Sequence, residues 1–242
     1  MSEQAPVRYE ENEGIARIIF NRPETLNALN KEVLQQLASL LDKVRAEDAV
    51  KAVIVTGAGD ESFSAGAETL GKVVAAAING YALGGGLELA EACMFRVAVR
   101  HARLGHPEVR IGAIAGFGGT TPLPRLIGKG RATELLLTGR LTTAEEAHQI
   151  GLVHRVVEPE NLLSETEELL REVLAQSPGA VRLTWEAIHR GLNLTLEEST
   201  LLGADYFGLV AATDEFRQRT KSFLEEKRAS RSPAPASSSL LP

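Results

Sequence analysis

The chain has little cysteine, tryptophan or methionine, and aromatic residues make up only 5% of its 242 residues. The single cysteine, Cys93, excludes an intrachain disulfide, and its apolar neighbours indicate a small buried hydrophobe. The five histidines do not cluster with Cys93 or with carboxylates at metal-ligand spacing. His106 and Glu108 are close in sequence, but no third ligand accompanies them. The sequence therefore predicts no metal site.

Long apolar runs and an excess of basic residues are also missing. No run is long enough to span a bilayer, and the N-terminal segment is polar and acidic, unlike a signal or transit peptide. We therefore expect a cytoplasmic protein. The 26 basic and 32 acidic side chains give a net charge of −6, which disfavours nonspecific binding to nucleic acid or anionic membranes.

Aliphatic residues and glycine are abundant, and they alternate between two patterns in the first half. The chain is 44% hydrophobic with 22 glycines, enough for one large α/β domain with or without a small appendage. Short apolar runs predict strands over residues 15–20, 53–55, 73–78 and 95–99, and helical spacing predicts a helix over 30–44. Strands separated by helices indicate parallel pairing, with ligands at the strand ends.

The second half is mostly helical from Arg131 onward, with one short strand predicted over residues 152–157. Ser177-Pro178 has the form of an N-cap followed by proline at the first helical position. Three further pairs have capping-box spacing: Thr142 with Glu145, Ser164 with Glu167, and Thr195 with Glu198.

The segment NGYALGGGLELA, residues 79–90, is the first candidate for chemistry. A predicted strand ends, three glycines follow, and a helix begins. Glycine lets the backbone approach a ligand, and the first amides of a helix are free to bind an oxyanion. If the helix starts near Gly85, Gly85 and Glu88 share a face and serve one pocket. The same residues could form an ordinary packing turn with an acidic helix N-terminus.

The segment LGHPEVRIGAIAGFGG, residues 104–119, offers a second carboxylate. Glu108 follows a proline between apolar stretches, and burial would help it hold a proton, as a general acid must. A surface glutamate after a turn is the plainer interpretation. Two weaker candidates are FSAGA, residues 63–67, which could add an amide donor, and NRPETLNALN, residues 21–30, which could line a groove.

Together and in this order, these motifs resemble the enoyl-CoA hydratase/isomerase (crotonase) family. The resemblance covers about residues 7–228 and includes LPRLIGKGRATELLLTGR and TAEEAHQIGLVHRVV as well as the segments above. It implies an α/β fold, a spiral of repeated ββα units followed by a C-terminal helical trimerisation region. The implied division is a ββα core over residues 1–190, a helical region for oligomerisation and coenzyme A contacts over 191–229, and a disordered tail over 230–242.

The resemblance also implies an activity and its residues. Family hydratases add water to a 2-enoyl-CoA thioester and give a 3-hydroxyacyl-CoA. Here Glu88 would activate the water, Glu108 would protonate the α carbon, and the amides of Ala67 and Gly85 would form the oxyanion hole. The implied substrate-binding residues are Asn27, Ala28, Leu29, Ala65, Gly66, Gly84, Gly116, Phe223 and Lys227. No cofactor is implied beyond coenzyme A as part of the substrate, and the implied assembly is a homotrimer or a hexamer formed by two trimers.

Between Glu68 and Lys72 the sequence departs from the family, whose members carry about 25–30 more residues there, far beyond an ordinary connection. Either this is a true deletion, which would open the acyl pocket, or a loop is missing from the sequence. Other activities stay open. An enoyl-CoA isomerase would need one main carboxylate at Glu108, other acyl-CoA lyases and hydrolases share the fold, and an RNA-binding or scaffolding role is disfavoured by the net charge.

Overall fold

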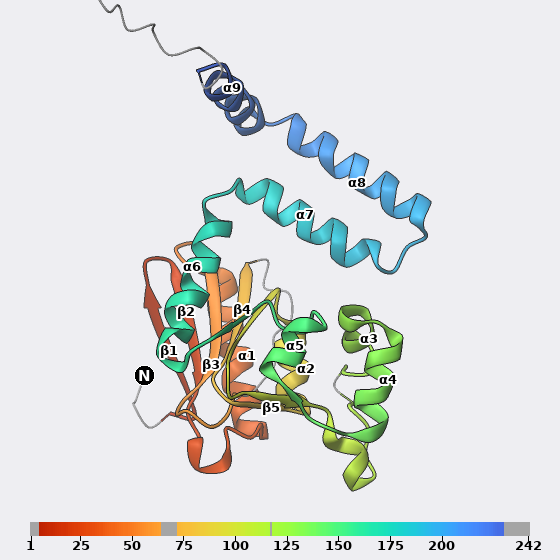
Figure 1. Cartoon of the computed structure of the whole chain (residues 1–242). Helices are drawn as coiled ribbons and strands as arrows, with labels where there is room; N and C mark the ends of the chain where they lie inside the picture. Colours follow the sequence, from red (N-terminus) through yellow and green to blue (C-terminus); the bar gives the residue numbers. More distant parts are fainter. Residues whose placement is uncertain (1–4, 64–71, 117, 230–242) are drawn as a thin grey trace, which may run out of the picture. The chain divides into compact units, whose positions relative to one another are not determined.

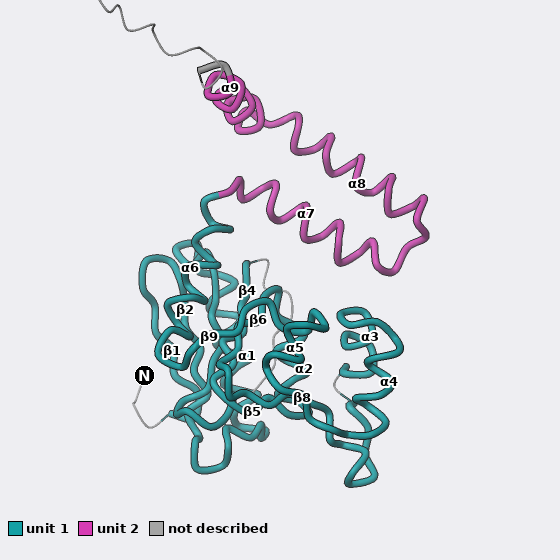
Figure 2. Tube along the Cα trace, viewed as in Figure 1, with its two compact units in different colours: residues 1–175 teal, residues 176–242 magenta. Residues whose placement is uncertain are grey.

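The computed structural model describes residues 5–63, 72–116 and 118–229. The chain forms two compact units, residues 1–175 and 176–242, shown in different colours in Figure 2. The predicted tail over residues 230–242 lies outside the described residues. Among the described residues, no helix has the length and apolar character needed to cross a membrane.

A six-stranded sheet is the centre of the first unit (Figure 1). β1 and β2 form an antiparallel hairpin through Glu13 and Gly14, both at positive φ as a two-residue turn requires. All other neighbours pair in parallel, which confirms the predicted parallel arrangement. The strands, in sheet order, are β1 (Val7–Asn12), β2 (Ile15–Phe20), β3 (Ala52–Gly57), β4 (Val73–Ile78), β6 (Phe95–Val99) and β9 (Arg155–Val157).

The central strands are covered on both faces. Every residue of β3 and β4 is buried, as expected for a parallel strand with continuous apolar sequence. On α1 (Lys31–Ala46), Val33, Leu37, Leu40 and Val44 are buried at helical spacing, and Asn30 caps the helix by accepting from the amide of Val33. The predicted helix over residues 30–44 is therefore confirmed.

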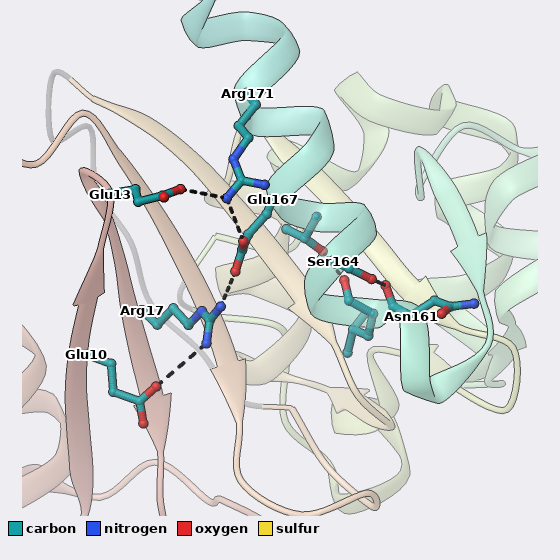
Figure 3. Close-up of polar contacts among 9 residues, drawn as sticks. Glu10, Glu13, Arg17, Asn161, Ser164, Glu167 and Arg171 are labelled. Carbon is teal, nitrogen blue, oxygen red and sulfur yellow. Dashed lines mark hydrogen bonds and ion pairs between the residues drawn. The ribbon is translucent and has the colours of Figure 1, made fainter.

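Helix α6 (Leu162–Leu174) packs against β3, β4 and β6, and ion pairs connect it to the hairpin. Figure 3 shows Arg17 between Glu10 and Glu167, and Arg171 joined to Glu167 and Glu13, both at 3.2 Å. The prediction that Ser164 caps this helix is wrong. Ser164 lies inside the first turn and its hydroxyl donates to the carbonyl of Asn161, because a 3-10 turn over Pro159–Asn161 leads directly into α6.

A second, three-stranded sheet carries the segments that matter for chemistry. β5 (Tyr81–Leu83) pairs in parallel with β7 (Arg103–Gly105), and β7 pairs antiparallel with β8 (Thr142–Thr143). These strands were not predicted, because two or three residues carry no periodic pattern. The helices and 3-10 turns around them are η1 (Pro23–Thr25), α2 (Gly85–Ala92), η2 (Pro107–Ile111), α3 (Pro122–Ile127), α4 (Lys129–Thr138) and α5 (Ala144–Gln149).

Several boundaries differ by a few residues from the prediction, two of them around α5. Thr142 pairs in β8, so Thr143 caps α5 in its place and accepts from the amide of Glu146. The last strand of the large sheet is confined to Arg155–Val157, because residues 152 and 153 form the turn after α5.

The second unit contains α7 (Pro178–Gly191), α8 (Leu196–Ala211) and α9 (Asp214–Ala229). The predicted caps at Ser177 and Thr195 are confirmed, and Thr195 with Glu198 forms a complete capping box. α7 packs along α8, and Tyr206 joins them by accepting from Arg190 and donating to Glu186. The compact units divide before α7. The division into a ββα core over residues 1–190 and a helical region over 191–229 stays a prediction. An oligomerisation role for these helices stays a prediction.

Candidate active site

The turn from β5 into α2 strongly favours glycine. Gly84 has φ 53° and ψ −126°, a conformation that an L side chain rarely adopts. A Cβ atom at Gly84 would also lie 2.8 Å from Oε1 of Glu108. The Gly84 amide donates to the carbonyl of Gly105, so this turn is held against β7. α2 then begins at Gly85, as predicted, and its first amides have no partner within the helix.

Glu88 lies in the first turn of α2 and is only 6% exposed. Its Oε1 accepts from the backbone amide of Gly119 at 2.8 Å, which fixes the carboxylate. Its Oε2 is buried and has no hydrogen-bond partner among the described residues. A Cβ at Gly85 would lie 3.8 Å from this Oε2 and 3.5 Å from Cδ1 of Leu29. Glu88 therefore turns a free oxygen toward the glycine turn.

Glu108 reaches the same turn from the other side. It is the second residue of η2, directly after Pro107, and its side chain is 17% exposed. Oε1 faces Gly84, and Oε2 is buried without a partner in the part of the chain that the structure describes. Two carboxylates therefore converge on the Gly84-Gly85 backbone, each with a free oxygen that could hold a water molecule or exchange a proton.

A buried pair that the sequence did not reveal lies behind these carboxylates. Nε2 of His106 is 2.9 Å from Oε1 of Glu91, and both side chains are almost fully buried. On its other side, Nδ1 of His106 is 3.9 Å from Oε1 of Glu108. The available signal was that Glu91 follows Glu88 by one helical turn and that His106 precedes Glu108 by two residues. Nothing in the spacing places the two segments in contact.

Burial and charge act on this pair in opposite directions. Burial of the ring lowers the pKa of His106, but the hydrogen bond and charge of Glu91, with the charges of Glu108 and Glu88, outweigh it and raise the pKa. Burial raises the pKa of Glu91, and His106 and Arg96 oppose that shift. Arg96 is itself buried and donates to the carbonyls of Leu152, Ala90 and Cys93.

The chain resembles known proteins over most of its length. The model of the enoyl-CoA hydratase/isomerase family matches residues 10–72 and 67–231. The chain belongs to this family. It is 39% identical to the crotonyl-CoA hydratase of Syntrophomonas wolfei, over 91% of this chain and 95% of that protein. It is 37% identical to the short-chain-enoyl-CoA hydratase of Clostridium acetobutylicum, over 90% and 94%.

The fold is the crotonase fold. The crystal structure of an enoyl-CoA hydratase from Bacillus anthracis superposes with a TM-score of 0.86 at 34% identity, covering 91% of this chain and 96% of that one. The predicted α/β fold, with repeated strand-helix units followed by helices, is therefore confirmed.

The family match also locates the departure seen in the sequence. The match to the Syntrophomonas wolfei protein runs over 247 aligned positions. It includes 91% of the 242 residues of this chain, which is about 220 residues. About 27 aligned positions of that protein therefore have no counterpart in this chain. The two segments matched by the family model meet at residues 67–72. Ala65, Gly66 and Ala67, predicted for the oxyanion hole and substrate binding, lie outside the described residues.

The remaining predicted crotonase-site residues are scattered. Asn27 is buried at φ 53°, and its side chain binds the backbone of Arg22, Ala58 and Ser62, so it shapes the loop. Leu29 approaches Gly85, whereas Ala28 and Gly116 are exposed. Phe223 and Lys227 lie together on α9 in the second unit, with the ammonium 5.9 Å from the ring centroid. Their binding of coenzyme A stays a prediction.

No group of three metal-ligating side chains with metal-site geometry occurs in the described ranges.

Proposed function

We propose that this protein is an enoyl-CoA hydratase, which adds water across the double bond of a 2-enoyl-CoA thioester and gives a 3-hydroxyacyl-CoA. The observation that carries the proposal is the convergence of Glu88 and Glu108, each with a buried free oxygen, on the Gly84-Gly85 turn. Support also comes from the family and from relatives named as crotonyl-CoA and short-chain-enoyl-CoA hydratases.

Each step of the proposed reaction is assigned to a residue of the site. Glu88, fixed by the amide of Gly119, takes a proton from a water molecule while the water oxygen attacks the β carbon. Negative charge then builds on the thioester oxygen, to which the Gly85 amide at the start of α2 donates in the proposed mechanism. A donor of this kind contributes about 3–4 kcal/mol. Glu108 delivers a proton to the α carbon. Ala67 remains the proposed second donor.

Two other functions are less well supported. An isomerase that moves the double bond needs one carboxylate to shuttle a proton, and the buried, fixed Glu88 would then have no role. An RNA-binding role would require a basic surface, and the net charge is −6.

The test is to mix the full-length protein with crotonyl-CoA, follow the loss of the conjugated enoyl-thioester absorbance, and determine the molecular mass of the product by mass spectrometry. A product heavier by one water, with activity reduced at least about 100-fold in Glu88→Gln and in Glu108→Gln, supports the proposal. Glu168→Gln, on the exposed face of α6, is the matched control and should keep full activity. A product of unchanged mass with a shifted double bond would show an isomerase, and unchanged hydration in both glutamine variants would refute the assigned roles.

Three further points belong to the same proposal. The substrate is an acyl-CoA, and no cofactor is needed beyond the coenzyme A that it carries. The assembly is a homotrimer or a hexamer, which light scattering of the purified protein would distinguish. The cytoplasmic location is an expectation that fractionation would test.

A further inference from the structure

The reaction proposed above uses Glu88 and Glu108 but gives no role to Glu91 and His106. Both are buried, with side chains 0% and 1% exposed. A charged pair is costly to bury and is kept only when its geometry is good. Hydrophobic residues would fill the same space at less cost, so the pair calls for a function.

His106 contacts the surroundings of both proposed catalytic carboxylates. Nδ1 faces Oε1 of Glu108 at 3.9 Å. The edge of the ring also lies against Gly119, where a Cβ would be 2.7 Å from Cε1 of His106. The amide of Gly119 is the group that fixes Glu88. A movement of the ring would therefore disturb Glu108 directly, and it would disturb Glu88 through Gly119.

The charges around the ring come from three elements. Glu88 and Glu91 face it from α2, Glu108 faces it from η2, and Arg96 of β6 acts on Glu91. A protonated imidazole whose Nδ1 lies 3.9 Å from Oε1 of Glu108 attracts the carboxylate that remains after Glu108 has given up its proton.

We propose that Glu91 and His106 form a positioning pair, in which the Glu91 carboxylate keeps the His106 imidazole protonated and oriented, and the imidazole thereby sets the pH range in which Glu108 donates its proton. The inference rests on the proposed function. His106 acts through Glu108 and Gly119 and does not touch the substrate.

The kinetic test compares pH profiles of kcat/KM for crotonyl-CoA in the wild type, His106→Gln, Glu91→Gln and the double variant. Loss of the positive charge should move the alkaline limb of the profile to higher pH, by about one unit or more for His106→Gln. Glu91→Gln should shift it less, in the same direction, because the ring stays but loses its charge more easily. KM should stay within about twofold. His148→Gln, an exposed histidine outside the site, is the matched control.

The double variant guards against a failure to fold. His106→Gln alone leaves Glu91 buried without a partner, whereas two glutamines can bond to each other and leave no buried charge. The double variant should reproduce the alkaline shift of His106→Gln. A double variant whose melting temperature falls while its pH profile stays in place would show a merely structural pair and overturn the proposal.

A second readout does not depend on activity. NMR titration of the His106 ring should give a lower midpoint in Glu91→Gln and in Glu108→Gln than in the wild type, because each change removes a facing negative charge. An unchanged midpoint in Glu108→Gln would overturn the coupling. A wild type that shows this coupling but does not hydrate crotonyl-CoA would refute the proposed function and leave the pairing intact.

Discussion

Replacing Gly84 by alanine should damage stability and catalysis together. Gly84 lies at φ 53° and ψ −126°, where strain for a residue with a Cβ costs about 1–3 kcal/mol. The added Cβ would also lie 2.8 Å from Oε1 and 3.4 Å from Cδ of Glu108. Real Cβ contacts are not as short as 2.8 Å, so the carboxylate must move aside, and the disturbance falls on a group that the proposed reaction needs.

These two effects predict different observables. A loss of about 2 kcal/mol should lower the melting temperature by about 4–8 °C in a domain of this size. Displacement of Glu108 by an amount on the order of 1 Å should lower kcat for crotonyl-CoA by about 100-fold, since proton transfer depends steeply on geometry. KM should change much less, because neither the Cβ nor the carboxylate supplies most of the contact with the substrate.

Melting curves and steady-state kinetics of the full-length variant provide the assay. Gly130→Ala is the matched control, because Gly130 lies inside α4 and a Cβ there meets nothing within 4 Å. The control should be equal to the wild type or more stable by about 0.5–1 kcal/mol, with unchanged kcat. If Gly84→Ala melted within about 1 °C of the wild type and kept its kcat, the assigned turn geometry would be refuted.

Three other predictions concern buried groups. Burial raises the pKa of the Cys93 thiol to about 12. A thiol reagent at pH 8 should therefore label the folded protein very slowly and should label one thiol per chain in urea. Fast labelling of the folded protein would contradict this. Arg96→Met should cost about 2–5 kcal/mol in urea unfolding, because the buried carbonyls of Leu152 and Cys93 lose their charged donor, and a cost below ~1 kcal/mol would refute this role. The raised pKa of His106 makes its contribution to stability complete below about pH 6.5 and lost as pH rises through the folded value. Urea unfolding from pH 6 to pH 9 should therefore show a decline in the wild type that is smaller in the His106→Gln and Glu91→Gln double variant.

The long elements could be predicted from the sequence because each carries its own periodic signal. The strand over residues 15–20 and the strand over 73–78 have the predicted bounds, and α1 begins one residue later and ends two residues later than predicted. Continuous apolar runs identify strands covered on both faces, and the Asn30 cap marks the helix start. These signals are local, so no knowledge of the tertiary structure was needed.

The short elements could not be predicted, because tertiary contacts stabilise them. β5, β7 and β8 are two or three residues long and exist as strands only because they pair with one another. The same pairing moved the cap of α5 from Thr142 to Thr143. Ser164 has capping-box spacing with Glu167, but Glu167 pairs with Arg17 of β2 and leaves the predicted box unformed.

Only part of the candidate site could be predicted from local sequence patterns. Glu88 and Glu108 were predicted through a family resemblance carried by their own motifs, and the structure brings both to the turn at Gly84. Glu91 and His106 have no such motif. Their contact arises because β5 and β7 pair in parallel. Since the paired strands run side by side, α2 and η2, which follow them, start next to each other. A three-residue strand pair thus aligns all four ionisable groups. A substitution that weakens the pairing of β5 with β7 should therefore uncouple Glu88 from Glu108 before it unfolds the large sheet, which hydrogen exchange at the amide of Gly84 would detect.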